Sequence, residues 1–230
     1  MDFSDKKQSE NSKDFVYRKL RSSIMSLDIK PGTFISENEL VKQTNISRTP
    51  IREVLKRLEN ERLIEIIPQT GSRVTYIDKS MISESLFMRF ALEKEIIRSL
   101  QNTITNEEIT TLENNISLQE FYYKKELIVD FQMTDVSFHK SMFDICHKNR
   151  LWEYMKIISV DYDRMRLIRI LYGVKPNIDS IISEHKRLLD AIKNKKSYEY
   201  IEDVLNQHFM KPMEEFMAFF EKLGFKDYFI

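Results

Sequence analysis

Glycine and proline are scarce in this chain, which holds four glycines and five prolines among 230 residues. Because tight turns depend on these residues, their scarcity favours long helices joined by short loops over a β-sandwich or barrel. The glycines are also too dispersed to form a phosphate-binding loop or a dinucleotide fingerprint. With 42% apolar residues available for a core, the composition predicts a mainly α-helical globular protein.

Charge and cysteine content exclude several classes of protein. The net charge is zero, although residues 1–77 carry 14 basic against 11 acidic side chains and residues 78–230 carry 22 against 25. The single cysteine, Cys146, excludes an internal disulfide and a cysteine-rich zinc site. No apolar run approaches 18 residues, and the N-terminus lacks the pattern of a signal peptide. We therefore expect a cytoplasmic protein that has no membrane partner.

The first third of the chain has the pattern of a helix-turn-helix. Polar residues 1–12 predict a disordered tail, and apolar residues at helical spacing then predict a helix over 14–27. A short helix over 36–43 and a longer one over 48–61 follow, separated by a short polar turn. Two consecutive helices joined in this way are typical of a DNA-binding motif, in which the second helix enters the major groove.

Capping residues mark the starts of these two helices. Ser36 is the expected N-cap of the short helix, and Glu39, three residues later, completes a capping box. Ser47 is the expected N-cap of the longer helix, and Pro50 lies in its first turn, where a missing N–H group costs little.

A β-hairpin is expected directly after the longer helix. Apolar segments at 63–67 and 72–76 flank a turn at 68–71, which predicts the wing of a winged helix. Guanidinium groups can pair with guanine, while hydroxyls and a helix N-terminus bind phosphates. A small α/β module with an ordinary basic face remains the alternative. The predicted DNA contacts are Ser47, Arg48, Thr49, Arg52, Gly71 and Arg73.

Several short motifs in this region carry a family resemblance. They are Pro31-Gly32, Ser36-Glu37-Asn38-Glu39-Leu40, the run Ser47-Arg48-Thr49-Pro50-Ile51-Arg52-Glu53-Val54-Leu55, and then Leu58, Leu63-Ile64, Pro68, Gly71 and Val74. Residues 14–76 therefore resemble the GntR family of bacterial transcription regulators. The resemblance implies that Arg48, Thr49 and Arg52 contact DNA, in a homodimer on an inverted-repeat operator. Asn38 stands where the family often has arginine, which leaves a DNA contact there open.

The remainder of the chain is helical in pattern throughout. Residues 79–230 contain only two glycines and two prolines. Capping and turn residues divide them into six expected helices, which form an antiparallel bundle. Pro212 cannot donate to the carbonyl of residue 208, which predicts a bend beside His208. The expected helices lie near 80–101, 105–124, 126–147, 149–172, 176–194 and 197–221.

Three of the four histidines stand beside apolar positions of the predicted bundle. Asp135 and His139 are four residues apart and so share one helix face, while His185 and His208 lie on two further helices. Three imidazoles and one carboxylate suit a divalent metal such as zinc, nickel or manganese. The alternative is that each histidine is an ordinary hydrogen-bonded core residue. His147 is expected at a solvated helix end.

The motifs around these residues carry a second resemblance. They are Arg89-x-x-Leu92-Glu93, Asp135-x-x-Phe138-His139, Glu184-His185-x-x-Leu188-Leu189-x-Ala191-Ile192 and the final His208. They resemble the FCD ligand-binding domain of the FadR-like branch of GntR regulators. The resemblance implies that Asp135, His139, His185 and His208 bind a metal, and that a small organic acid effector binds that metal through its carboxylate. Candidate partners of the acid are Arg89, Arg164 and Arg169.

These patterns predict a disordered tail over 1–12, a winged helix-turn-helix DNA-binding domain over 13–77 and a helical effector-binding and dimerisation domain over 78–230. The predicted function is ligand-responsive regulation of transcription by a homodimer. A metal-dependent helical enzyme is one alternative, although the chain has no Glu-x-x-His pair and no His-Glu-x-x-His motif. A DNA-binding protein without an effector is the other.

Overall fold

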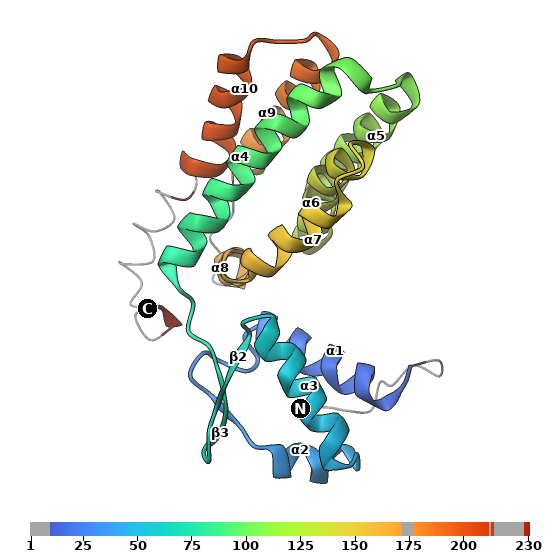
Figure 1. The fold of residues 1–230 in the computed structure, drawn as a ribbon. Coiled ribbons are helices and arrows are strands. Elements are labelled where there is room, and N and C mark those ends of the chain that lie inside the picture. The colour runs from blue at the N-terminus through green and yellow to red at the C-terminus, as the bar shows by residue number, and fades with distance from the viewer. Residues whose placement is uncertain (1–9, 172–176, 212, 214–227) are drawn as a thin grey trace. The chain divides into compact units, whose positions relative to one another are not determined.

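The computed structural model describes residues 10–171, 177–211, 213 and 228–230 (Figure 1). The chain divides into two compact units, here called the N-terminal unit and the helical unit. The N-terminal unit comprises Met1–Ile82, Ser159–Tyr172 and Gly224–Ile230, and the helical unit comprises Ser83–Ile158 and Gly173–Leu223. The N-terminal unit therefore contains three stretches, 78–82, 159–172 and 224–230, that the sequence assigned to the C-terminal domain.

The winged helix-turn-helix is confirmed in the N-terminal unit. Asn11 caps α1 by accepting a hydrogen bond from the backbone N–H of Asp14, so that α1 starts two residues earlier than expected. Most of the predicted tail lies outside the described residues. The elements are α1 (Ser12–Met25), β1 (Phe34–Ile35), α2 (Glu37–Thr44), α3 (Arg48–Asn60), β2 (Ile64–Ile67) and β3 (Gly71–Val74).

Strand β1 is an element that the sequence did not predict. It adds to the hairpin in the order β1-β3-β2, with both pairs antiparallel and with Phe34 opposite Arg73. A strand of two residues is too short to show an alternating pattern, so only its pairing with β3 reveals it. Ile35 at its end is buried, and Ser36 directly after it caps α2.

The two predicted caps behave differently. The side chain of Ser36 accepts from the backbone N–H of Glu39, as expected for an N-cap. Ser47 is the N-cap residue of α3, but its side chain makes no capping hydrogen bond, so that part of the prediction is wrong. Pro50 occupies the third helical position and has no N–H group, which removes one of the two usual donors to an N-cap side chain.

Helix α8 (Val160–Leu171) belongs to the N-terminal unit. The sequence predicted one helix over 149–172, but the chain forms α7 (Asn149–Ile158) and then α8, separated at Ser159. Val160 is part of the same apolar core as the buried residues of α1 and α3. Arg164 is fully buried and donates to the carbonyl oxygen of Thr75 at 2.9 Å. This bond ties α8 to the segment that follows the wing.

The helical unit is a bundle, as the sequence predicted. Helix α5 packs against α6 and α9, α9 packs against α10, and α6 packs against α7. The expected bend in the last helix falls partly on Pro212, which lies outside the described residues. Among described residues, the α-helical pattern ends at Leu205 and a π-helical turn, η1 (Asn206–Met210), follows. The other helices are α4 (Lys79–Thr103), α5 (Asn106–Lys124), α6 (Ile128–Ile145), α9 (Ile178–Lys193) and α10 (Tyr198–Leu205).

We expect Arg164→Met to destabilise the N-terminal unit by about 3 kcal/mol, because it leaves the buried Asp161 carboxylate without its cation. It also removes the donor to Thr75. Thermal or urea unfolding measures this loss. Arg166→Met, on the same helix at a half-buried position, is the control and should cost less than about 1 kcal/mol. Equal stability of the two variants would contradict the structural role of Arg164.

Candidate metal centre and DNA-reading face

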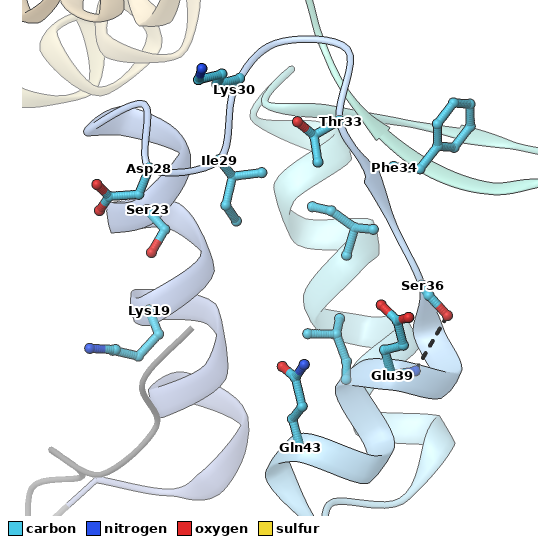
Figure 2. A pocket seen from close by; sticks show the side chains of 12 residues that line it. Lys19, Ser23, Asp28, Ile29, Lys30, Thr33, Phe34, Ser36, Glu39 and Gln43 are labelled. Atoms are coloured by element: carbon cyan, nitrogen blue, oxygen red, sulfur yellow. Dashed lines mark hydrogen bonds between the residues drawn. The ribbon is translucent and has the colours of Figure 1, made fainter.

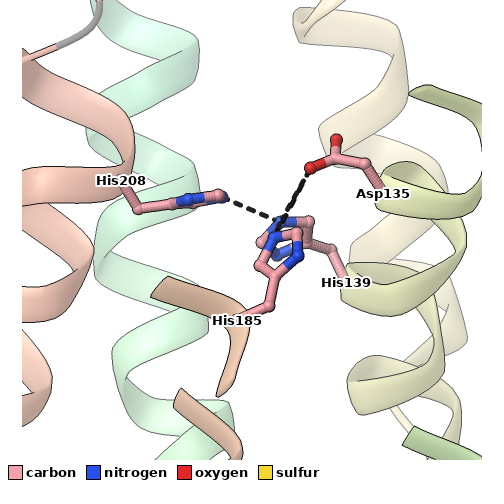
Figure 3. A group of neighbouring side chains, drawn as sticks. All are labelled: Asp135, His139, His185 and His208. Carbon is pink, nitrogen blue, oxygen red and sulfur yellow. Dashed lines mark hydrogen bonds and ion pairs between the residues drawn. The ribbon is translucent and has the colours of Figure 1, made fainter. Parts of the chain in front are cut away.

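Four side chains from three separate segments of the chain meet inside the helical unit (Figure 3). Asp135 and His139 lie one turn apart on α6, His185 lies on α9, and His208 lies on the π-helical turn. All four are buried, and one ligand atom from each lies within 4.8 Å of the others. The structure thus brings together the four residues that the sequence identified as metal ligands. We call them the Asp/His cluster.

The Nε2 atoms of the three imidazoles form the centre of the Asp/His cluster. His139 Nε2 lies 3.1 Å from His208 Nε2 and 3.3 Å from His185 Nε2. Asp135 Oδ1 lies 3.4 Å from His185 Nε2 and 4.0 Å from His139 Nε2. Adjacent ligands at about 2.1 Å from one metal ion are roughly 3.0–3.4 Å apart, so most of these separations fit a shared ion.

Each imidazole ring is oriented by a hydrogen bond at its Nδ1 atom. His139 Nδ1 lies 2.6 Å from Glu93 Oε2 on α4, and His185 Nδ1 lies 2.7 Å from Gln119 Oε1 on α5. His208 Nδ1 lies 2.8 Å from Glu184 Oε2 on α9. The sequence analysis did not assign these three supporting residues. Glu93 and Glu184 stood inside the quoted motifs, whereas nothing in the sequence pattern distinguished Gln119.

These bonds determine which ring nitrogen carries the proton. Carboxylates only accept hydrogen bonds, and Gln119 presents its oxygen because its amide nitrogen donates to Asn115. Each Nδ1 is therefore the donor, which leaves Nε2 as the ring atom that can direct a lone pair toward the centre. Burial lowers the pKa of His139, and it lowers that of His185 well below the ordinary value. Lone pairs facing one another at these distances repel unless a cation lies between them.

Glu93 also joins the cluster to Arg89. Arg89 Nε donates to Glu93 Oε1 at 2.9 Å, and its guanidinium lies 4.4 Å from the centre of the Phe209 ring. Burial raises the pKa of Glu93, but His139 and Arg89 outweigh burial and hold the pKa at about 2. Glu93 is therefore ionised, and Arg89 brings positive charge beside the Asp/His cluster.

Of the other two arginines of the predicted effector site, Arg164 is held by groups of the N-terminal unit, and the side chain of Arg169 is not described. Arg164 belongs to the N-terminal unit, where its guanidinium bonds Thr75 and Asp161. Because its guanidinium is held by these groups, the structure gives no support to the effector contact that the sequence suggested for Arg164. Arg169 lies in α8, but its side chain is outside what the structure describes. His147 is exposed at the end of α6, as expected.

We expect Gln119→Ala to lower the affinity for divalent metal about 10- to 100-fold, because His185 loses the partner that orients its ring. Competition with a chromophoric chelator measures the affinity. Ser117→Ala on the same helix, which is exposed and contacts only the Glu113 carbonyl in the described bonds, should leave the affinity unchanged. Unchanged affinity in Gln119→Ala would contradict its supporting role.

A second candidate site lies on the N-terminal unit. Ser47, Arg48, Thr49 and Arg52 are exposed at the start of α3. Both arginines, the first turn of α2 and wing-tip residues 69–71 line a cleft of about 500 Å³. The structure thus places three of the predicted DNA contacts, Arg48, Arg52 and Gly71, around one cleft, which we call the reading cleft.

Residues of α2 hold the two arginines of α3. Arg48 Nη2 donates to Asn38 Oδ1 at 3.1 Å, and Arg52 Nε donates to Glu37 Oε2 at 2.9 Å. Asn38, noted in the sequence only as a departure from the family pattern, therefore supports Arg48. Glu37 was not predicted as a site residue, and only the fold brings it to Arg52.

The wing contributes a glycine and an arginine to this face. Gly71 has a φ of 128°, a conformation that side-chain-bearing residues rarely adopt. Arg73 Nε donates to Glu65 at 2.6 Å, and its guanidinium lies 5.9 Å from the ring centres of Phe34 and Tyr76. Arg73 is thus supported by the surface of the sheet, and its contact with phosphate stays a prediction.

Figure 2 shows another cavity of the N-terminal unit, of about 630 Å³, between α1 and the β1–α2 segment. Its lining includes charges of both signs, with Lys19, Asp28 and Lys30 on or after α1 and Glu39 on α2. These side chains do not converge as those of the Asp/His cluster do. The reading cleft and the Asp/His cluster therefore remain the candidate sites.

Comparison with known families decides the classification. Residues 12–74 match the model of bacterial regulatory proteins of the gntR family, and residues 84–210 match the FCD domain model. The second match alone covers more than half of the chain. The chain belongs to the GntR family of transcription regulators, in the FadR-like branch with an FCD domain. It therefore combines a DNA-binding winged helix with a ligand-binding helical domain.

Curated relatives are named as transcription regulators, and a solved structure shares the fold. The HTH-type transcriptional repressor RspR of Escherichia coli strain K12 is 29% identical over 199 residues, which cover 86% of each chain. The gluconate operon transcriptional repressor of Bacillus licheniformis is 28% identical over 179 residues, covering 76% of this chain and 73% of the relative. The structure of E. coli McbR/YncC has a TM-score of 0.72 at 18% identity, covering 92% of this chain and 99% of that one.

Within the described part of the chain, no helix is both long and apolar enough to cross a bilayer. The relatives are named as transcription regulators rather than enzymes.

Proposed function

We propose that this GntR regulator represses transcription by binding an inverted-repeat operator as a homodimer, and that a metal-bound organic acid changes this binding. Asp135, His139, His185 and His208 would hold the metal. The observation that carries the proposal is the convergence of three Nε2 atoms whose rings are each fixed through Nδ1. Zinc, nickel and manganese suit three nitrogen ligands and one carboxylate.

The effector would be a small carboxylic acid. Four protein ligands leave one or two positions on a divalent ion, and the bound ion supplies a positive centre for an oxyanion. Arg89 adds charge beside the cluster and is our proposed partner of the acid. Arg169 stays a predicted contact without structural support.

One continuous helix links the effector site to the N-terminal unit. Helix α4 begins at Lys79 in the N-terminal unit and carries Arg89 and Glu93 within the helical unit. An effector that binds more tightly to one arrangement of Glu93 and His139 would shift the population of α4 positions. Regulation follows if the protein binds the operator with different affinity in each of these α4 positions.

The enzyme alternative is less well supported by the site. A metal could activate water, but a general base must then be available beside it. Glu93 and Glu184 both accept hydrogen bonds from ligand histidines, and Glu93 also pairs with Arg89. Asp135 belongs to the ligand set. The described carboxylates around the cluster thus have supporting or ligating positions, which favours binding over catalysis.

The double variant His139→Ala, His185→Ala should lose its bound metal, because two of four ligands are removed. Elemental analysis of the purified protein measures metal per chain. His147→Ala is the matched control, since His147 is exposed and outside the cluster. Undiminished metal in the double variant would refute the ligand assignment, and metal loss in the control would point to another site.

Arg52→Ala should weaken operator binding by about 1–3 kcal/mol, because the major-groove face of α3 loses a guanidinium. A gel-shift titration at fixed salt measures the change. Lys13→Ala, an exposed change on α1, serves as the control and should bind as the unmodified chain does. Equal affinity of the Arg52 variant would remove Arg52 from the DNA contacts.

A further inference from the structure

We propose that Glu37 is a specificity-determining residue of the reading cleft, because it positions the Arg52 guanidinium to read a guanine. This inference rests on the proposed operator binding of α3. Glu37 is the first residue of α2, and its Oε2 accepts from Arg52 Nε at 2.9 Å. The side chain of Arg52 is 68% exposed, while that of Glu37 is 27% exposed.

The bond uses one specific edge of the guanidinium. Arginine has five donors in a planar fork, and Glu37 takes the one on Nε. The two terminal nitrogens are left on the opposite edge, and their spacing matches guanine O6 and N7 in the major groove. Without Glu37, the flexible side chain of Arg52 can turn its Nε edge toward a phosphate instead. Glu37 therefore selects the base-reading orientation over the phosphate-binding one.

The elements that carry Glu37 hold it firmly in place. Strand β1 pairs with β3, with Ile35 opposite Ser72, and leads into α2 through the Ser36 cap. Leu40 of α2 is buried in the same core as Ile51 of α3. The carboxylate and the guanidinium it supports thus come from two packed helices, so the orientation of Arg52 is set before DNA arrives.

Stability does not explain an ion pair at this position. Exposed pairs contribute about 0–1 kcal/mol, because water screens them. A carboxylate on a DNA-binding face also repels phosphates and weakens non-specific binding. The orientation of Arg52 and the repulsion of phosphates both raise the ratio of specific to non-specific affinity. The hydrogen bonds from Arg52 to the correct base are retained, while binding to the DNA backbone is weakened.

The neighbouring residues provide matched comparisons. Asn38 supports Arg48 through a neutral amide, so that pair lacks the repulsive charge. Glu39 lies in the same first turn of α2 and is exposed, and the described contacts give its carboxylate no bond to Arg52. Replacing Glu39 therefore changes the charge of the cleft without disturbing the support of Arg52.

The test selects binding sites from a random duplex DNA library with the full chain and its variants. We expect the unmodified chain to select a guanine at one position of each half-site. Glu37→Ala should lose that preference and keep the others, whereas Glu37→Gln, which retains an acceptor oxygen, should keep more of it. Glu39→Gln, which leaves the bond between Glu37 and Arg52 in place, should keep the guanine preference even though the loss of its charge changes the overall affinity. Circular dichroism and melting temperature establish that each variant is folded.

A second measurement addresses the guanine directly. Replacing the selected guanine by 7-deazaguanine should weaken binding of the unmodified chain roughly tenfold, and should leave Glu37→Ala almost unaffected. An unchanged consensus in Glu37→Ala, or an equal loss of preference at every position, would overturn the proposal. If the unmodified chain selects no sequence at all, operator recognition itself fails, which is a different outcome.

Discussion

Three buried imidazole rings with their Nε2 atoms facing one another are the constraint around which the helical unit is organised. Burying a polar group without a partner costs several kcal/mol, and here each Nδ1 atom finds an acceptor on another element. Glu93 comes from α4, Gln119 from α5 and Glu184 from α9. The single cluster thus connects most helices of the bundle at one point.

The same principle of supported polar groups recurs in the N-terminal unit. Arg48 and Arg52 project from α3, but α2 supplies the acceptors that orient them. Strand β1 pairs with β3 of the wing and leads directly into α2. The wing tip and the acceptors of the two arginines are therefore fixed relative to each other. A reading surface built on packed elements can discriminate bases because its donors do not need to be ordered by the DNA.

Local patterns predicted the parts of the site that depend on spacing. Asp135 and His139 lie one turn apart because they are four residues apart, and this follows from helix geometry alone. Their meeting with His185 and His208 was implied by family resemblance, since spacing within one helix carries no information about other helices. Gln119 and Glu37 were missed for this reason: each acts through a partner more than a dozen residues away. The failed cap at Ser47 was a local error, because the missing N–H group of Pro50 was visible in the sequence.

The sequence by itself determined the helix-rich class and the winged helix-turn-helix, and it predicted the four residues proposed as metal ligands, because these depend on turn residues, apolar periodicity and recognisable motifs. The tertiary structure alone decided that α8 separates from α7 at Ser159 and packs with the N-terminal unit, where Arg164 bonds Thr75. It also decided which acceptors form hydrogen bonds with the three histidines and with Arg48 and Arg52. The physical reason is that such partners are chosen by the packing of whole elements, which no local pattern of residues encodes.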